Sequence, residues 1–506
     1  MTVLKKKIIN FRFFPILFLC VCLGSLIASL TFNEHFFDYY VIGIGVVLGI
    51  IVLFATKGRG LALLFICAFL LSYLLASVQI DDGIKQVESA EGDIVTVRVE
   101  HVEDNVIYVS VKEGMEISGL SQFDTTGVYD YPLEVGCELI LGDVKVQKIS
   151  PLEADGVLNT YYYNSQTKYV MTAKELLGFQ KGSPNIVEII RNSLTNAVDN
   201  MPYELRGVTM ALLTGDKYAI SSKTYDAYRV SGVAHVLAVS GMHVGFLVIF
   251  LEWLLKRFRL RRLLRIFIIL PVAFFLCALC DFTPSVVRSA IMVGVHLLIP
   301  VLSKRRYDML SSISLSGVII VLASPMSIYS YGFLLSFASV IGIILFANRF
   351  DKMLKFLPRF ISKTVSVSLA TTVTVFPLSV YLFGEFSLLS IVTNTLVLPV
   401  MTVGYGILVG LACIAVVFPP FSFVIVGGSW LVYYLNFITG VIASVDIASI
   451  SLSAPLWFIA LYYTFVLLLS DFVNLSKTVK RLILISFIIL GCAYFSFFCN
   501  FSPKIY

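Results

Sequence analysis

Long apolar stretches recur along the chain and are separated by short polar loops. Each runs for roughly 16 to 24 residues, and about 20 helical residues cross the roughly 30 Å of hydrocarbon in a bilayer. Because lipid offers backbone groups no hydrogen-bond partners, these stretches are expected to be helices. Three of them, at 13–30, 39–55 and 61–79, form a predicted N-terminal unit over 1–80. The whole chain is predicted to contain about thirteen spans.

Between 81 and 182 the pattern changes from helical to strand-like. Alternating apolar and polar residues favour half-buried strands. About five strands in about 100 residues fit a small β-barrel or sandwich, and an OB-like barrel is the expected form. The next segment, 183–230, is predicted to be one or two amphipathic helices at the outer surface, followed by a transmembrane domain over 231–506. The alternating segments are IVTVRVE at 94–100, NVIYVSV at 105–111, CELILGDVKVQKI at 137–149 and TKYVMTA at 167–173.

Composition excludes an ordinary soluble protein. Of the 506 residues, 58% are hydrophobic and 14% are charged, whereas about a quarter are charged in soluble domains. Cytoplasmic loops retain Lys and Arg, which orients the spans. The predicted class is an α-helical polytopic membrane protein with an extracytoplasmic β-barrel, a cytoplasmic N-terminus and an external C-terminus. The basic clusters that give this path lie at 5–12, 57–59, 256–265, 304–306, 349–363 and 477–481.

The sequence offers no convincing metal or cofactor motif. Cys277 and Cys280 form a CxxC inside an apolar stretch, with no second ligand pair nearby, so packing is the expected role. The segment TGDK at 214–217 lacks the Gly-Lys-Ser/Thr ending of a phosphate-binding loop. We therefore expect no bound metal, no cofactor and no catalytic residue, and energy for any transport must come from elsewhere.

The strand-rich segment is acidic, which argues against long-range attraction of nucleic acid. Residues 81–181 contain 18 Asp and Glu against 8 Lys and Arg. Negative charge repels phosphate, so binding there would need a local basic patch beside aromatic rings on which bases stack. The alternative is a barrel that is purely structural or docks a partner. The candidate patch comprises Lys145, Lys148, Tyr161 and Lys168.

Five blocks then follow in an order that resembles the ComEC competence family. They are ALLTGDK at 211–217, VSGVAHVLAVSGMHVGFL at 230–247, DFTPSVVRSAIM at 281–292, SPMSIYSYGFLLSFASVIG at 324–342 and FPLSVYLFGEFSLLSIVTNTLVLPV at 376–400. The resemblance implies a channel, not an enzyme, that passes single-stranded DNA across the bacterial cytoplasmic membrane during natural transformation. It also implies three separate partners besides the DNA and the lipid bilayer: a cytoplasmic ATPase, an outer DNA receptor and a nuclease.

Two departures from the family pattern are visible. The family usually has Asp-Pro-Gly-Phe-Gln in the fourth block, where this chain has Ser-Tyr-Gly-Phe-Leu at 330–334. Many relatives also carry a C-terminal metallo-β-lactamase-like domain, thought to be a nuclease. No two of the five histidines here stand two apart as HxHxDH requires. The chain therefore resembles the form of the family that lacks this domain.

Physical considerations identify candidate residues within these blocks. A polyanion needs a hydrated path, and small or hydroxyl residues with broken helices supply polar walls. If one helix carries both His235 and His243, eight residues apart, their side chains lie about 80° apart and can face one cavity. The alternative is that each ring satisfies a nearby backbone group. The predicted lining of the path is His235, Ser240, Gly241, His243, Thr283, Ser285, Arg288 and Asn394.

A helix restart is predicted in the third block. Thr283 is a suitable N-cap and Pro284 suits the first helical position, so exposed amides would face the outer side. Arg288 lies one turn inside, and an arginine within a membrane is a functional candidate. Guidance of phosphate by Arg288 and a structural Asp281–Arg288 ion pair are both open.

Two other function classes fit parts of the sequence. A secondary transporter or flippase would use the intramembrane Asp281, Arg288 and histidines as a proton or substrate site. An intramembrane serine hydrolase would use Ser240 with His243, although a nucleophile and its base usually come from separate elements.

Overall fold

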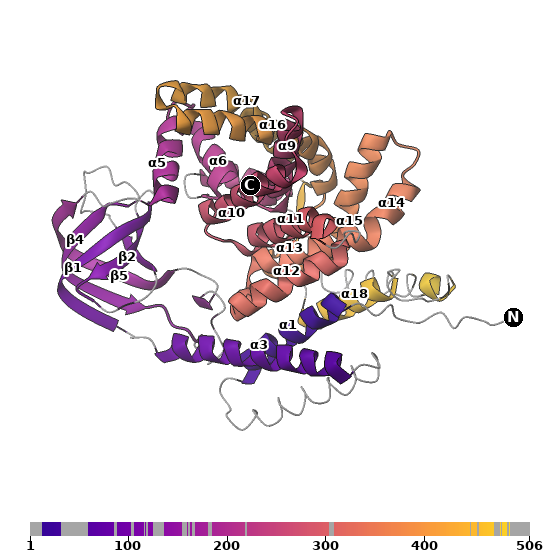
Figure 1. Cartoon of the computed structure of the whole chain (residues 1–506), viewed down its shortest axis with the longest axis horizontal. Helices are drawn as coiled ribbons and strands as arrows, with labels where there is room; N and C mark the ends of the chain where they lie inside the picture. The colour runs from indigo at the N-terminus through magenta and orange to yellow at the C-terminus, as the bar shows by residue number, and fades with distance from the viewer. Residues whose placement is uncertain are drawn as a thin grey trace.

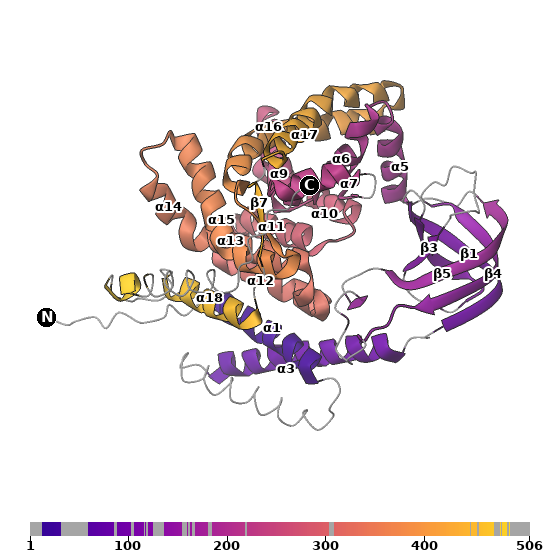
Figure 2. The ribbon, with the colours of Figure 1, turned by 180° about the vertical axis from the view of Figure 1, so that it is seen from behind.

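A computed structural model describes most of the chain (Figure 1). The described residues are 13–31, 59–85, 89–102, 106–115, 117, 120–124, 136–153, 159, 162–163, 167–180, 185–217, 220–302, 308–445, 447–452, 455–469, 476, 478–482 and 485. The second predicted span, 39–55, lies outside them. A barrel of strands occupies one end of the molecule, and a bundle of helices fills the rest; the view from behind shows the same separation (Figure 2).

The helices follow the apolar stretches of the sequence. Eight described helical spans are long and apolar enough to cross a membrane, and two shorter apolar helices accompany them. The helices are α1 (Phe13–Thr31), α3 (Arg59–Lys85), α5 (Ile186–Val198), α6 (Tyr203–Thr214), α7 (Ser222–Val230), α8 (Ala234–Leu237), α9 (Gly241–Arg257), α10 (Arg262–Leu279), α11 (Pro284–Leu302), α12 (Met309–Ala323), η2 (Pro325–Tyr329), α13 (Tyr331–Gly342), η3 (Ile343–Ala347), α14 (Asn348–Met353), α15 (Arg359–Phe383), α16 (Ser390–Val417), η4 (Pro419–Gly428), α17 (Ser429–Ala443) and α18 (Leu456–Leu469).

The strand-rich segment folds as a closed barrel. Its strands are β1 (Ser89–Val102), β2 (Val106–Glu113), β3 (Leu120–Asp124), β4 (Glu138–Lys148) and β5 (Thr167–Gln180), in the order β1-β2-β3-β5-β4. β3 and β5 pair in parallel and the other neighbours are antiparallel. Val95, Val97 and Val99 are fully buried at alternate positions of β1. The alternation seen in the sequence therefore marks the barrel interior. A small second sheet pairs β6 (Glu385–Ser387) with β7 (Ser449–Ser451).

Small and hydroxyl residues hold α1 against α3. The Ser72 hydroxyl donates to the Val21 carbonyl and accepts from Ser25, both at 2.7 Å. A Cβ built on Gly24 would lie 2.5 Å from the Phe69 carbonyl oxygen. Without a hydrophobic drive between helices in lipid, close backbone approach and such hydrogen bonds provide the association.

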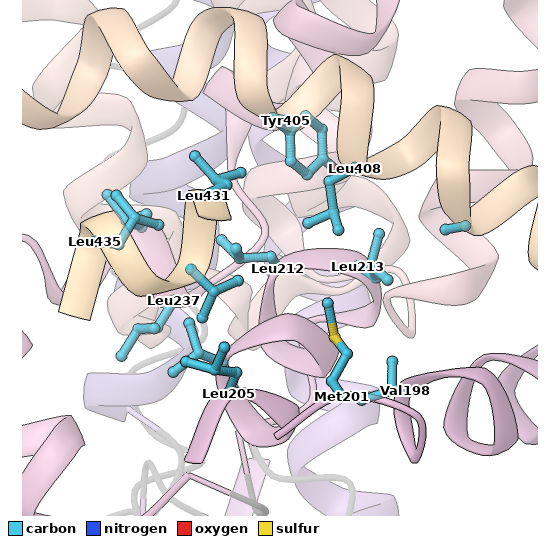
Figure 3. Close-up of a cluster of buried hydrophobic side chains, with 14 of the residues drawn as sticks. Val198, Met201, Leu205, Leu212, Leu213, Leu237, Tyr405, Leu408, Leu431 and Leu435 are labelled. Carbon is cyan, nitrogen blue, oxygen red and sulfur yellow. The ribbon is translucent and has the colours of Figure 1, made fainter. Parts of the chain in front are cut away.

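The segment after the barrel differs from the prediction of one or two surface helices. It forms three helices, and α6 is buried along most of its length. Leu205, Leu212 and Leu213 pack with residues of α16 and α17, including Tyr405 and Leu431 (Figure 3). Polar residues such as Glu204 and Arg206 made the segment look interfacial, yet its apolar face is wide enough to enter the core.

We expect Gly24→Val to destabilise the protein by about 1–3 kcal/mol, because the added side chain forces α1 and α3 apart. Gly410→Val is the matched control, since a Cβ there meets nothing within 4 Å. The measurement is the thermal unfolding midpoint of each purified variant in detergent. Equal midpoints for the two variants would contradict the close packing described for α1 and α3.

Candidate functional site

His235 and His243 do not share a helix, contrary to the prediction. α8 ends at Leu237, Ala238 and Ser240 are extended, and α9 begins at Gly241. His235 is exposed, whereas His243 is fully buried. The helix breaks because Ser240 caps α9 together with the side chain of His243, three residues on. The two rings therefore differ in exposure, and the helical-wheel argument does not apply to them.

His243 is held locally by the start of α9. Its Nδ1 accepts from the Ser240 backbone amide at 3.1 Å and lies 3.3 Å from the Ser240 hydroxyl. The neutral ring must then carry its proton on Nε2, which is buried and has no hydrogen-bond partner. The ring also packs edge-on against Tyr405 at 4.7 Å. Within the part of the chain that the structure describes, no side chain hydrogen-bonds Nε2 and so fixes the orientation of the ring. The contact is therefore a helix cap rather than a nucleophile–base arrangement.

The predicted helix restart at Pro284 is confirmed. α11 begins there, and the amides of Val286 and Val287 both donate to the Thr283 carbonyl. Asp281 forms its ion pair with Arg191 of α5, at 2.7 Å, and not with Arg288 as one reading of the sequence proposed. The sequence could not show this partner, because it lies 90 residues away.

Arg288 is buried among oxygen atoms of α11 and α13. It is 5% exposed, its Nη1 donates to the Ser336 carbonyl at 2.8 Å, and its Nη2 donates to the Ser289 hydroxyl at 3.2 Å. The Ser285 and Ser336 hydroxyls are hydrogen-bonded to each other at 3.0 Å. These neutral groups solvate a cation in a region where water is scarce.

The N-terminus of α9 abuts this arginine. A Cβ on Gly241 would lie 2.4 Å from the Ser289 hydroxyl and 2.5 Å from Arg288 Nη2, so only glycine fits. Gly245, one turn along the same face, has nothing within 4 Å of its Cβ position. The positive end of the α9 dipole and the Arg288 guanidinium therefore lie in close contact, and two such positive groups together favour an anion.

The order of blocks in the sequence corresponds to a closed ring of contacting helices. α9 contacts α11, α11 contacts α13, α13 contacts α15, α15 contacts α16, and α16 contacts α9. Each of the last four blocks contributes at least one of these helices. Gly241 of α9 abuts Arg288 of α11, and Arg288 bonds Ser336 of α13. Segments far apart in sequence therefore build one polar cluster.

Asn394 and Gly232 lie in a second polar region, on α16 and before α8. The Asn394 Oδ1 is buried without a hydrogen-bond partner. Gly232 has a φ of 79°, and a Cβ there would lie 2.5 Å from the Ser390 Cβ. Arg229 pairs with Glu385, whose side chain is 12% exposed, so Glu385 is held in an ion pair at this junction.

The basic patch predicted on the barrel is not a surface patch. Lys148 is 8% exposed and donates to the Ile84 carbonyl at 3.3 Å. Lys168 donates to the Tyr162 carbonyl and lies 4.3 Å from the centre of the Tyr162 ring. Lys145 is exposed and paired with Glu91. Tyr161 lies outside the described residues. Lys148 and Lys168 contribute to the junction between α3 and the barrel, whereas Lys145 pairs within the barrel. Burial lowers the pKa of Lys168 to about 8.

Sequence reasoning missed Arg191, Ser289, Ser336 and Tyr405. Ser289 and Ser336 lie inside blocks that the sequence singled out, and their one-turn spacing from Ser285 and Gly332 was a usable signal. Arg191 had no such signal, because nothing local distinguishes it from other charges on an amphipathic helix.

The fold and the buried cluster define a multi-pass membrane protein that carries a five-stranded barrel and a polar, arginine-containing centre within a ring of helices. The family described as "Competence protein" matches residues 212–474, about half of the chain. The protein belongs to this family and is a protein of the cell membrane.

Curated relatives agree with this assignment. The chain is 32% identical to ComE operon protein 3 of Bacillus subtilis over 272 residues, which cover 52% of this chain and 33% of that protein. It is 32% identical to an uncharacterized protein of Aquifex aeolicus over 148 residues (29% and 35%), and 22% identical to the uncharacterized protein YcaI of Escherichia coli over 330 residues (59% and 43%). The chain thus spans less than half of each relative. No solved structure matches it.

Buried Lys168 predicts a pH dependence of stability. Its folded pKa of about 8 lies below the ordinary 10.5, so the unfolded chain binds more protons between these values. Stability should then rise as pH increases through that window. Burial raises the pKa of Tyr162 from its ordinary 10.0 to about 12. This tyrosine therefore makes stability fall as pH increases, but only above about pH 10.

We expect the thermal midpoint of the wild type, relative to that of Lys168→Met, to increase from pH 8 to pH 10. The methionine variant keeps the buried chain length and lacks the titrating group. Differential scanning fluorimetry in detergent measures both profiles. Parallel profiles across this range would show that Lys168 is not desolvated.

Proposed function

We propose that the protein passes single-stranded DNA across the bacterial cytoplasmic membrane during DNA uptake. The observation that carries the proposal is the placement of Arg288 and the N-terminus of α9 together inside the ring of helices. Membership of the competence family supports DNA as the substrate. The cluster supplies what a phosphodiester needs: a fixed cation, hydroxyl donors and the positive end of a helix.

The polar cluster suits passage better than tight binding. Arg288 already donates to Ser336 and Ser289, so a phosphate would exchange for these neutral acceptors and be released again at similar cost. Conduction requires such weak, replaceable contacts. Because Arg288 is 5% exposed, this arrangement is a closed one, and a strand would pass only after α9 and α11 separate. Gly241 allows the two helices to approach closely, so this separation has to break the packing between them.

The remaining organisation is part of the same proposal. The strand order of the barrel, with β3 parallel to β5, is that expected of an OB-like domain. We place it outside the cell, with a cytoplasmic N-terminus, an external C-terminus and about thirteen spans in all. We also propose that the chain is divided into four parts, at 1–80, 81–182, 183–230 and 231–506. A cytoplasmic ATPase, an outer receptor and a separate nuclease are the proposed partners.

The hydrolase alternative rests on the contact between Ser240 and His243. That contact uses the imidazole Nδ1, which also accepts the Ser240 amide, and Nε2 has no orienting partner. A transporter or flippase would need a titrating site, yet Asp281 is tied to Arg191. Both alternatives are therefore less well supported than a conduit for an anionic strand.

We expect Arg288→Gln to lower the internalisation of labelled DNA about tenfold to a hundredfold, since a charge-assisted hydrogen bond contributes about 1.5–3 kcal/mol. Glutamine keeps a donor for the surrounding oxygens, so insertion and folding should persist. Uptake is measured as DNA protected from external nuclease, separately from DNA bound outside.

Arg265→Gln is the matched control. Arg265 is similarly buried and pairs with Glu252, which also has Lys256 as a partner. It should leave uptake within twofold of the wild type. If Arg288→Gln behaves the same way, Arg288 does not contact the passing strand. If deletion of the whole protein leaves uptake intact, the proposed function is wrong.

A further inference from the structure

α5 carries two opposite charges one turn apart that contact different parts of the molecule. Glu188 forms an ion pair with Arg98 of β1, and the two side chains are 6% and 15% exposed. Glu188 also accepts from the Asn185 amide, in a capping box that fixes the start of α5. The first turn of this helix is thereby attached to the barrel, and its position follows that of β1 (Figure 1).

Arg191, three residues later, reaches the bundle instead. Its Nη2 donates to the Leu279 carbonyl at 2.6 Å and to Asp281 Oδ2 at 2.7 Å. The other final carbonyls of α10 accept from the backbone: those of Cys277, Ala278 and Cys280 bond the amides of Phe282, Asp281 and Thr283. Arg191 completes this set as a cationic cap at the negative end of α10.

The turn that Arg191 holds is strained. Asp281 and Phe282 both have a φ of 50°, in the left-handed region that a β-carbon disfavours. Phenylalanine gains no compensating local hydrogen bond there, unlike aspartate, so surrounding contacts must maintain the conformation. A cavity of about 330 Å³ lies beside the turn, lined by Arg191, Asp281 and Phe282 together with Glu100 and Glu188. The turn therefore has room to move if Arg191 releases it.

This turn directly precedes α11. Pro284 begins the helix two residues after Phe282, and Arg288 follows one turn later. The placement of α11 relative to α9 and α13 depends on where the turn directs it. A continuous path of contacts thus runs from β1 through Glu188, Arg191 and Asp281 to the helix that carries Arg288.

We propose that Arg191 is a positioning residue that couples the barrel to the buried arginine cluster. With the barrel docked, Arg191 holds the strained turn and α11 stays packed against α9 and α13. When the barrel shifts, α5 withdraws Arg191, the turn relaxes into the adjacent cavity, and the half-buried Ser285 and buried Arg288 of α11 become more accessible. The role assigned to this opening depends on the proposed function, but the coupling itself is a property of the fold and can be tested without DNA.

The test uses full-length protein in lipid nanodiscs, with its native cysteines replaced and one reporter cysteine introduced. Ser285→Cys reports on the start of α11, because Ser285 is hydrogen-bonded to Ser336 in the closed arrangement. Ser316→Cys, fully buried on α12, reports on general loosening of the bundle. The rate of labelling by a water-soluble maleimide is measured at each position.

We expect Arg191→Met, Asp281→Asn and Glu188→Gln each to accelerate labelling at position 285 at least threefold, with no change at position 316. Arg265→Met, which breaks an ion pair of similar burial elsewhere, should change neither rate. Arg191→Lys keeps the charge and should give a smaller acceleration than Arg191→Met.

Two results would overturn the coupling. Unchanged labelling at position 285 in Arg191→Met would show that Arg191 does not hold α11 closed. Equal acceleration at positions 285 and 316 would show that the variants loosen the whole bundle. Neither result depends on DNA uptake, so failure of this inference is distinguishable from failure of the proposed function.

Discussion

The guanidinium of Arg288 can remain inside the helical bundle only because oxygen atoms of neighbouring helices surround it. Hydrocarbon offers a charged side chain no hydrogen-bond partner. Scales derived from membrane insertion put the free-energy cost of an arginine at the bilayer centre at about 2.5–3.5 kcal/mol. The Ser336 carbonyl of α13 and the Ser289 hydroxyl of α11 itself meet this requirement, and the bond to Ser336 ties α11 to α13. Gly241 then lets α9 approach the same point. The arrangement of the ring follows from the need to keep one cation solvated.

The same contacts would let the proposed anion site remain stable while it is closed. A cation satisfied by neutral oxygens is stable without a ligand, yet a phosphate would be a stronger partner because it carries charge. The barrier to opening lies in separating packed helices. Gly241 lets the backbone of α9 approach Arg288 and Ser289 of α11, and apolar side chains of the two helices, among them Val244 and Val286, pack in one cluster. Opening of the proposed path would have to disrupt this contact.

The barrel is attached to the helices by specific contacts. At the junction with α3, Lys148 donates to the Ile84 carbonyl, Tyr162 OH donates to the Gly83 carbonyl and Tyr163 OH donates to the Ile80 carbonyl. On the other side, Arg98 binds Glu188 of α5. The barrel is thus fixed to the first helices and to α5, so a force on it reaches the bundle at two defined places. The acidic barrel is therefore coupled to the helices by direct contact, although its charge repels polyanions at long range.

The sequence by itself determined the local elements, because hydropathy and periodicity act over neighbouring residues. Apolar runs marked the spans, alternation marked the barrel strands, and Thr283 with Pro284 marked the start of α11. Tertiary structure alone decided which charges meet. Asp281 pairs with Arg191 across 90 positions, and Lys168 packs half-buried against Tyr162. Such pairings depend on how helices and strands pack in three dimensions, and no periodicity along the chain records that packing.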